Sequence, residues 1–460
     1  MHAAMVKPQD AVIVSVLAAV LALGLTLATP TIGLQVVVGF LIVLVAFTSV
    51  PASLFLLIGS MLLSPEIAVG RVDGRGVGAR ELSLRVDDIL LAIIGFSWLV
   101  KTIIYRDLAL IRETPINRPI VYYMLICVLA TLVGIIAGRV RPLTGFFFIL
   151  KYFEYFFVFF MVVNHVSTKQ QVVRLVTALL AVCFVISVYA IAQIPSGQRA
   201  SAPFEGESGE PNTLGGYLVF IMAIVTGIFL HLKSGPIRVV LALLLGVISL
   251  ALMATLSRSS YLAAGVLMLA VAATQWRRPG VLALMLLLVI VLPFAMPANV
   301  KDRVNETFFG RQYGGEIKVG RVGLDLSTTE RLRSWQYVLK DWVHSPLIGR
   351  GVTGYAWADA QYVKILGETG LAGLVAFIFL IVRLWRRARE NFLAEQDPFC
   401  KGLAQGLLLG LVAMLAHGIG ANTFIIIRIM EPFWLCAGLV MVLPRLTSEQ
   451  TSPVTQRVPI

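Results

Sequence analysis

Long apolar runs separated by short polar segments extend over most of the chain, and this pattern predicts an all-α polytopic membrane protein. A bilayer core about 30 Å thick requires roughly 20 apolar residues in each helix that crosses it, and the runs have about that length. They are also too long and too frequent for the strands of a membrane β-barrel. We expect about fourteen spans, at residues 11–29, 32–49, 52–69, 88–104, 119–138, 145–163, 174–194, 213–232, 237–256, 260–275, 279–297, 363–385, 402–421 and 424–443.

Two features of the pattern leave room for a smaller number of crossings. Little more than Val50 and Pro51 separates the second span from the third, and the tenth span is short. A kinked or re-entrant segment at either place would lower the count, so the predicted range is about 12 to 14 helices.

Residues 299–362 form the only long polar segment of the sequence. It divides the chain into three expected parts: transmembrane helices over residues 1–298, one large extracytoplasmic loop over residues 299–362, and transmembrane helices with a short cytoplasmic tail over residues 363–460. The far end of the segment contains arginines, tryptophans and an acidic stretch directly before a span. We therefore expect the catalytic motifs in this loop.

Short basic loops predict the orientation of the chain in the membrane. If the spans alternate, the basic residues within 101–118, 169–174, 233–238, 276–278 and 383–401 all lie on one side. The positive-inside rule makes that side the cytoplasm. Both termini are then cytoplasmic and the long loop lies outside. The first apolar run lacks a small-residue cleavage signature and is predicted to be a membrane helix rather than a removed signal.

Composition agrees with this assignment and excludes several other classes. With 58% hydrophobic and 14% charged residues, the chain is too apolar for a soluble globular domain. The formal net charge of +13 comes from residues at the ends of apolar runs, which indicates topology signals and binding of anionic lipid-linked material rather than nucleic acid. Neither a CxxC motif, a metal-ligand cluster nor a nucleotide-binding loop is present in the sequence, so no cofactor and no metal are expected.

Several arginines in the predicted outer loops run against the topological bias, which gives them candidate roles. For each of these arginines the alternatives are a contact with a lipid headgroup, an ion pair on the protein surface, or binding of the substrate. Arg258 stands out because almost no loop separates the helices on either side of it, and an unpaired cation there costs a few kcal/mol. A bound anion would satisfy it, and Ser259 and Ser260 are expected to cap the following helix beside that anion. The arginines singled out are Arg139, Arg141, Arg199, Arg258, Arg321, Arg331 and Arg333.

Polar residues within the predicted spans carry weaker signals. Lys151 and Glu154 are three positions apart on one helix and are predicted to pair, as are Arg428 and Glu431. His417, near the outer end of its span, either packs with its own hydrogen bonds or lines the site.

Three stretches in the second half of the chain follow one another in a familiar order. Arg199 precedes a glycine-bearing loop and Asn212, which opens a helix; a Ser-Arg pair at 257–258 then begins another helix. The long loop follows, and its motif residues are Arg331, Trp335, the segment 341–351, Tyr362 and the segment 366–371. Together these stretches resemble the O-antigen ligase and polymerase family of lipid-linked glycan transferases.

The resemblance implies a fold, a place and a reaction. Members have a GT-C-like membrane fold and act at the outer face of the bacterial inner membrane. They transfer a glycan from a polyprenyl diphosphate to a sugar hydroxyl. Ligases are expected to have a His-Asn pair just before the tyrosine of the helix start, where this sequence has Asp359 and Ala360. An acidic residue there resembles the polymerases, so polymerisation of repeat units is predicted. The alternatives are ligation to lipid A core and transport of lipid-linked oligosaccharide.

The resemblance also assigns roles. Arg258, Arg331 and Arg199 are expected to hold the diphosphate, because the planar guanidinium binds phosphate oxygens bidentately. Asp359 is the candidate general base, and its alternative role is a helix-start charge or salt bridge. Glu368 is expected to be structural. The further diphosphate- or glycan-binding candidates are Arg333, Asn212, Trp335, Tyr362 and His417. A flippase and a chain-length regulator of the same pathway are the implied partners, together with membrane lipids.

Overall fold

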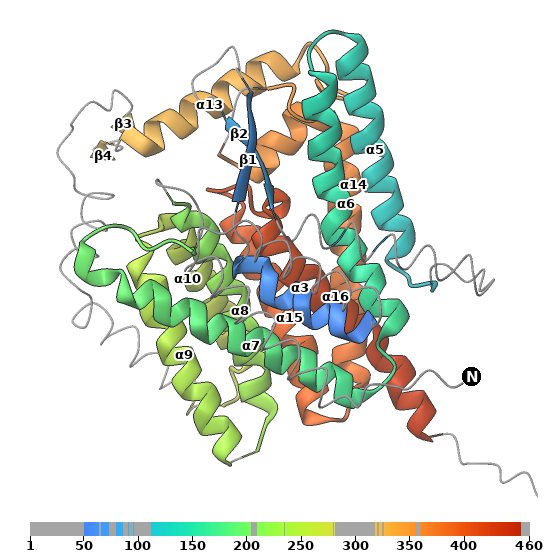
Figure 1. Ribbon diagram of the computed structural model, residues 1–460, viewed down its shortest axis with the longest axis vertical. Helices are drawn as coiled ribbons and strands as arrows, with labels where there is room; N and C mark the ends of the chain where they lie inside the picture. The colour runs from blue at the N-terminus through green and yellow to red at the C-terminus, as the bar shows by residue number, and fades with distance from the viewer. Residues whose placement is uncertain are drawn as a thin grey trace, which may run out of the picture.

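The structure, a computed structural model, describes residues 50–63, 66–72, 80–85, 91, 95, 112–203, 209–233, 235–278, 280, 318–319, 322–323, 326–355 and 359–451. Eight helices in these ranges are long and apolar enough to cross a membrane, so the predicted polytopic helical membrane protein is confirmed. They are α5 (Asn117–Ile136), α6 (Pro142–His165), α7 (Lys169–Ala192), α8 (Pro211–His231), α9 (Pro236–Ala254), α14 (Gln361–Ala394), α15 (Pro398–His417) and α16 (Ile427–Thr451) (Figure 1).

Shorter elements complete the described part of the chain. Helix α13 (Leu326–Trp342) lies within the predicted outer loop and extends along the upper left of Figure 1. Two small antiparallel hairpins, which the all-helical prediction did not include, pair β1 (Glu66–Val72) with β2 (Arg80–Arg85) and β3 (Lys318–Val319) with β4 (Val322–Gly323). The remaining elements are the α-helices α3 (Val50–Leu63) and α10 (Arg258–Thr274) and the 3₁₀ helices η1 (Ile194–Ser196) and η2 (Thr423–Ile425).

One predicted span, residues 52–69, is wrong. Helix α3 ends at Leu63 and strand β1 begins at Glu66. At 14 residues α3 is about 21 Å long, which is too short for a bilayer core. Pro65 follows the helix in the sequence, and proline cannot donate a backbone hydrogen bond. The predicted spans 11–29 and 32–49, and most of 88–104 and 279–297, lie outside the described residues; each of the others falls on one helix.

Helices α8 and α15 form the closest pair in the bundle, because glycines let their backbones touch. Gly402, Gly406 and Gly410 repeat every four residues on α15 and face α8. A Cβ on Gly402 would lie 2.6 Å from Cα of Ile228, and one on Gly227 would lie 2.5 Å from Cα of Gly406. Such small-residue stripes allow helices in a membrane to pack closely. The antiparallel contact brings the first turn of α8 beside the last turn of α15.

Helix α14 is broken at Gly370, whose φ of 66° is left-handed. A break frees backbone N–H and C=O groups that water cannot satisfy inside a membrane. Here the segment after α13 satisfies them through four hydrogen bonds of 2.8 to 3.0 Å. The N–H groups of Arg350 and Gly351 donate to Gly367 and Glu368, and those of Leu371 and Ala372 donate to Pro346 and Leu347. The loop after α13 therefore supplies the hydrogen-bond partners that the broken helix lacks.

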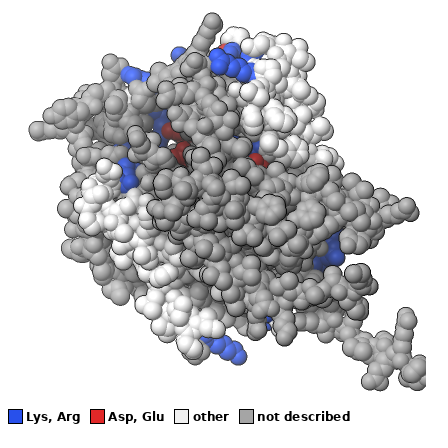
Figure 2. Space-filling view, viewed as in Figure 1, with Lys and Arg blue, Asp and Glu red and all other residues white. Residues whose placement is uncertain are grey.

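Contacts between loops agree with the predicted alternation of the spans. At the upper end of the bundle as drawn in Figure 1, Arg139 donates to Ser345 Oγ over 2.9 Å, which joins two loops predicted to lie outside. At the lower end, Arg278 donates to the Leu230 carbonyl over 3.1 Å, which joins a loop predicted to lie inside to the last turn of α8, next to another such loop. In Figure 2 the visible described Lys and Arg side chains appear at separate places, including the upper and lower ends.

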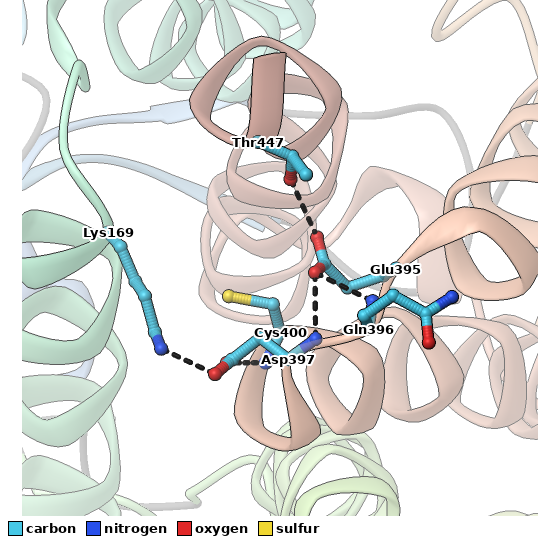
Figure 3. A network of polar contacts seen from close by, with 6 residues as sticks. All are labelled: Lys169, Glu395, Gln396, Asp397, Cys400 and Thr447. Carbon is cyan, nitrogen blue, oxygen red and sulfur yellow. Dashed lines mark hydrogen bonds and ion pairs between the residues drawn. The ribbon is translucent and has the colours of Figure 1, made fainter. Parts of the chain in front are cut away.

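A polar cluster at the lower end ties α7, α15 and α16 together (Figure 3). Lys169 pairs with Asp397, which also caps α15 by accepting from the Cys400 N–H over 3.1 Å. The carboxylate of Glu395 accepts from the N–H groups of the next two residues and from Thr447 Oγ1. Burial by itself would raise the pKa of Asp397, but the hydrogen bonds from Lys169 and Cys400 outweigh it, so this pKa lies below its ordinary value.

The break in α14 should make Gly370 intolerant of any side chain. A Cβ there would lie 2.6 Å from the backbone nitrogen of Ile348, and the left-handed φ disfavours other residues. We expect Gly370→Ala to destabilise the protein by about 1–3 kcal/mol, measured as thermal unfolding in detergent. The control is Gly265→Ala on α10, where a Cβ meets nothing within 4 Å. Equal effects of the two substitutions would contradict the role given to Gly370.

The cluster in Figure 3 predicts a pH-dependent contribution to stability. Because folding lowers the pKa of Asp397, its contribution is present above the ordinary carboxyl value of about 4 and is lost as the pH falls through the lower folded value. Asp397→Asn should reduce stability at pH 7 by about 1 kcal/mol or less, and the difference should shrink below about pH 4. Glu390→Gln, in the exposed pair with Arg387, is the control and should change little. A deficit that persists undiminished in acid would refute this account.

Candidate functional site

The candidate site lies at the upper end of the bundle, where α8 and α10 begin and α15 ends. Two adjacent glycines near the start of α8 make room for side chains from the other two helices. A Cβ on Gly215 would lie 2.8 Å from Ser260 Cβ, and one on Gly216 would lie 2.9 Å from His417 Cε1. Ser260 and His417 therefore pack directly against the α8 backbone, and both are fully buried.

Hydrogen bonds connect these buried side chains into one chain. His417 Nδ1 lies 2.7 Å from Thr423 Oγ1, and its Nε2 lies 3.1 Å from Ser260 Oγ. Ser260 donates to Ser257 Oγ over 2.8 Å, and Ser257 donates to Asn212 Oδ1 over 2.8 Å. The chain thus leads from the end of α15 across the start of α10 to the first turn of α8.

Arg199 joins the far end of this chain. Its Nη2 donates to Asn212 Oδ1 over 3.3 Å, and its Nε donates to the Thr255 carbonyl over 3.2 Å. Two contacts of the same guanidinium fix the direction of its plane. Arg199 itself is exposed, so the chain runs from the buried interior to the surface of the upper end.

Arg258 is the first residue of α10 and is half-buried. The cap of this helix is Ser257, whose side chain accepts from the Ser260 N–H, so the expectation that Ser259 and Ser260 cap the helix is wrong. The helix begins at Arg258, two residues before the predicted start at residue 260. Ser257 is therefore both the helix cap and a member of the buried chain.

Helix α13 brings two of the predicted residues towards the same place and leaves a third outside. Arg331 is half-buried, and its Nη1 would lie 3.9 Å from a Cβ on Gly420, in the turn after α15. Trp335 is half-buried, and its indole N–H has no hydrogen-bond partner in the described structure. Arg333 is exposed, because a spacing of two residues turns it away from Arg331 on a helix.

Asp359 lies just before α14 and is half-buried. Ala360 is the cap residue of that helix, and Gln361 follows it. The Gln361 N–H donates to the Gly418 carbonyl over 2.9 Å, and its side-chain oxygen accepts from the Phe424 N–H over 2.8 Å. These bonds attach the start of α14 to the turn that follows His417.

Two other predicted residues have internal partners. The Tyr362 hydroxyl donates to the Leu415 carbonyl over 2.6 Å, so this hydroxyl is engaged with α15. Glu368 pairs with Lys364 at 2.7 Å in a buried site and accepts from the Thr353 N–H over 2.9 Å. This geometry agrees with the structural role expected of Glu368.

The loop between α13 and α14 has its own polar support. Asp341 pairs with Arg350, whose guanidinium carbon lies 5.2 Å from the centre of the Tyr355 ring. Burial, followed by the nearby Asp341 carboxylate, raises the pKa of Tyr355. The Tyr355 hydroxyl is therefore neutral at physiological pH, and the aromatic ring packs with a cation in a fixed loop.

The structure thus gathers most of the predicted site at one end of the bundle. Arg199, Asn212 and His417 belong to one hydrogen-bonded chain, Arg258 lies beside its serines, and Arg331 approaches the same turn. Trp357 and Arg321 lie outside the described residues. The predicted Lys151–Glu154 and Arg428–Glu431 pairs stay predictions.

Sequence reasoning missed Thr423, Gln361 and the bridging role of Ser260. The available signal was the Gly215–Gly216 pair, because adjacent glycines inside a helix indicate that another chain segment approaches closely. In the part of the chain that the structure describes, no three His, Cys, Asp or Glu residues are placed to hold a metal ion.

These features define a multi-pass membrane protein with an arginine-containing polar site at one end of its bundle. Residues 241–378, which run from α9 into α14, match a family model described as O-Antigen ligase. This part of the chain therefore carries the domain of the O-antigen ligase and polymerase family, and the predicted resemblance is confirmed. No curated protein matches the chain.

The match covers Arg258, Arg331 and Asp359, whereas Arg199, Asn212 and His417 lie outside it. The match supports a membrane enzyme of the general O-antigen ligase and polymerase type. This family implies a glycosyltransferase-like reaction, and it implies a lipid-linked oligosaccharide and membrane lipids as partners.

Proposed function

We propose that the protein polymerises polyprenyl-diphosphate-linked oligosaccharide repeat units into O-antigen or exopolysaccharide. The reaction takes place at the outer face of the bacterial inner membrane, and the C-terminus lies in the cytoplasm. The observation that carries the proposal is the placement of three arginines: Arg199 on Asn212 at the start of α8, Arg258 at the start of α10, and Arg331 beside the turn to which the start of α14 is bonded.

The arginines supply what the donor requires. Its anomeric carbon is already activated by a diphosphate leaving group, so catalysis needs positive charge where negative charge develops. Guanidinium groups remain charged and bind phosphate oxygens in pairs. Arg199 is held by two hydrogen bonds, and Arg258 is half-buried at a helix start. This arrangement supports a transfer that needs no metal ion.

Asp359 is the proposed general base. The attacking sugar hydroxyl has to lose a proton, and a carboxylate ionised at neutral pH accepts it. Asp359 is half-buried and lies one residue before the cap of α14, which is attached to the turn after His417. Trp335 supports the same proposal, because its ring can stack on a sugar face and its indole N–H can donate to a sugar hydroxyl.

Ligation of finished glycan to lipid A core is the second candidate, and the description of the matching family favours it. The polymerase is preferred because Asp359 and Ala360 occupy the positions where a ligase is expected to have His-Asn. A flippase and a chain-length regulator of the same pathway are proposed as partners. Transport of the lipid-linked oligosaccharide is the third possibility.

Purified protein incubated with one lipid-linked repeat unit and no other acceptor should produce a ladder of longer lipid-linked glycans. We expect the same ladder with excess chelator, because arginines rather than a metal stabilise the leaving group. Gel electrophoresis of the released glycans measures it. Product that forms only after lipid A core is added would identify a ligase, and donor movement across vesicles without any transfer would identify a transporter.

Conservative substitutions should separate the two proposed roles. Asp359→Asn keeps the shape but cannot accept a proton, so turnover should fall about 10² to 10⁴-fold while donor binding survives. Arg258→Lys keeps the charge but loses the bidentate geometry, so donor binding and turnover should both weaken. Glu390→Gln and Arg141→Lys are the matched controls at exposed positions. Near-normal turnover in Asp359→Asn would remove it as the base.

A further inference from the structure

We propose that His417 is a positioning residue that orients Arg199 through the buried chain Ser260, Ser257 and Asn212. The inference rests on the proposed function, in which Arg199 binds the donor diphosphate. It assigns His417 a role different from the glycan contact expected from the sequence. The side chain is completely buried, and both of its ring nitrogens have hydroxyl partners.

The direction of the hydrogen bonds follows from the chemistry of each group. Asn212 Oδ1 can only accept, so the single hydroxyl proton of Ser257 is directed to it. Ser257 must then accept from Ser260, so the single hydroxyl proton of Ser260 is already used in that bond. The remaining bond to Ser260 is therefore donated by His417 Nε2–H. In the neutral ring with its proton on Nε2, Nδ1 accepts from the Thr423 hydroxyl.

Every proton in the chain consequently points towards Asn212 Oδ1. That oxygen accepts from Ser257 over 2.8 Å and from Arg199 Nη2 over 3.3 Å, which fixes the orientation of the carboxamide. The carboxamide in turn holds one edge of the guanidinium, while the Thr255 carbonyl holds Nε. Arg199 is thereby presented in one orientation at the upper end.

The burial of the chain explains why His417 can influence the substrate only through other residues. Ser257, Ser260, His417 and Thr423 are each completely buried. Buried polar groups are costly when one partner is removed, because the others are left unsatisfied. Loss of the imidazole leaves the Ser260 oxygen without its donor, so Ser260 can reorient, and the change passes through Ser257 to Asn212 and Arg199.

The test measures the affinity of purified protein in nanodiscs for polyprenyl diphosphate. His417→Leu removes both hydrogen bonds and should weaken binding about tenfold. His417→Gln keeps an N–H that can reach Ser260, so it should retain most of the affinity and turnover. Gln cannot act as a base, so retained affinity with abolished turnover would overturn the positioning role in favour of catalysis.

His231→Leu is the matched control. This residue lies at the other end of α8, where Nε2 is 2.7 Å from Gln405 Oε1, so it is also a hydrogen-bonded histidine of the bundle. We expect its loss to leave diphosphate affinity unchanged. An equal loss of affinity in both histidine variants would indicate a general effect on packing and would overturn the inference.

A double-mutant cycle with Arg199→Ala provides the decisive measurement. If His417 acts through Arg199, His417→Leu should have no further effect on affinity once Arg199 is replaced. Fully additive losses would overturn the inference and leave the diphosphate site intact. Unchanged affinity in Arg199→Ala alone would instead reject the proposed role of Arg199, and with it the inference. Thermal unfolding checks each variant, and Ser260→Ala replaces His417→Leu in the cycle if that variant does not fold.

Discussion

The approach of α8 to α15 is the contact on which the rest of the structure depends. Within a bilayer, apolar side chains gain little by leaving lipid for protein, so close packing has to come from shape and polar contacts. Gly402 and Gly406 permit this approach, and α8 and α15 are among the most buried spans described. The two helix ends that meet as a result carry Asn212 and His417. The close approach of α8 and α15 therefore determines both how the bundle packs and where the site residues lie.

The sequence predicted the helical, polytopic class because span length is imposed by the bilayer and not by tertiary context. It failed at residues 52–69, where an apolar run continues into a strand beyond Pro65. Hydropathy does not distinguish a short buried helix followed by a hairpin from one span. The break at Gly370 could not be predicted from hydropathy either, because the backbone groups that it frees are hydrogen-bonded by residues of the preceding loop.

For the site, the sequence suggested candidate residues more readily than the contacts between them. Arg199, Arg258 and Arg331 were singled out because arginines in predicted outer loops run against the positive-inside rule, and Asn212 was identified through the family resemblance. Their connection through Ser257 and Ser260 depends on which helices pack together, and periodicity along one chain carries no such information. His417 shows the difference most clearly: its position near a helix end was evident, but its burial between two hydroxyls was not.

The segment that completes α14 has a consequence for how this region can vary. Loops ordinarily accept inserted or deleted residues because few of their backbone groups have fixed partners. Here the carbonyls of Pro346 and Leu347 and the N–H groups of Arg350 and Gly351 are matched one to one with α14. The segment therefore has a register, as a strand in a sheet does. A gain or loss of one residue between 346 and 351 would mismatch the whole set, whereas substitutions of exposed side chains such as Leu347 leave it intact.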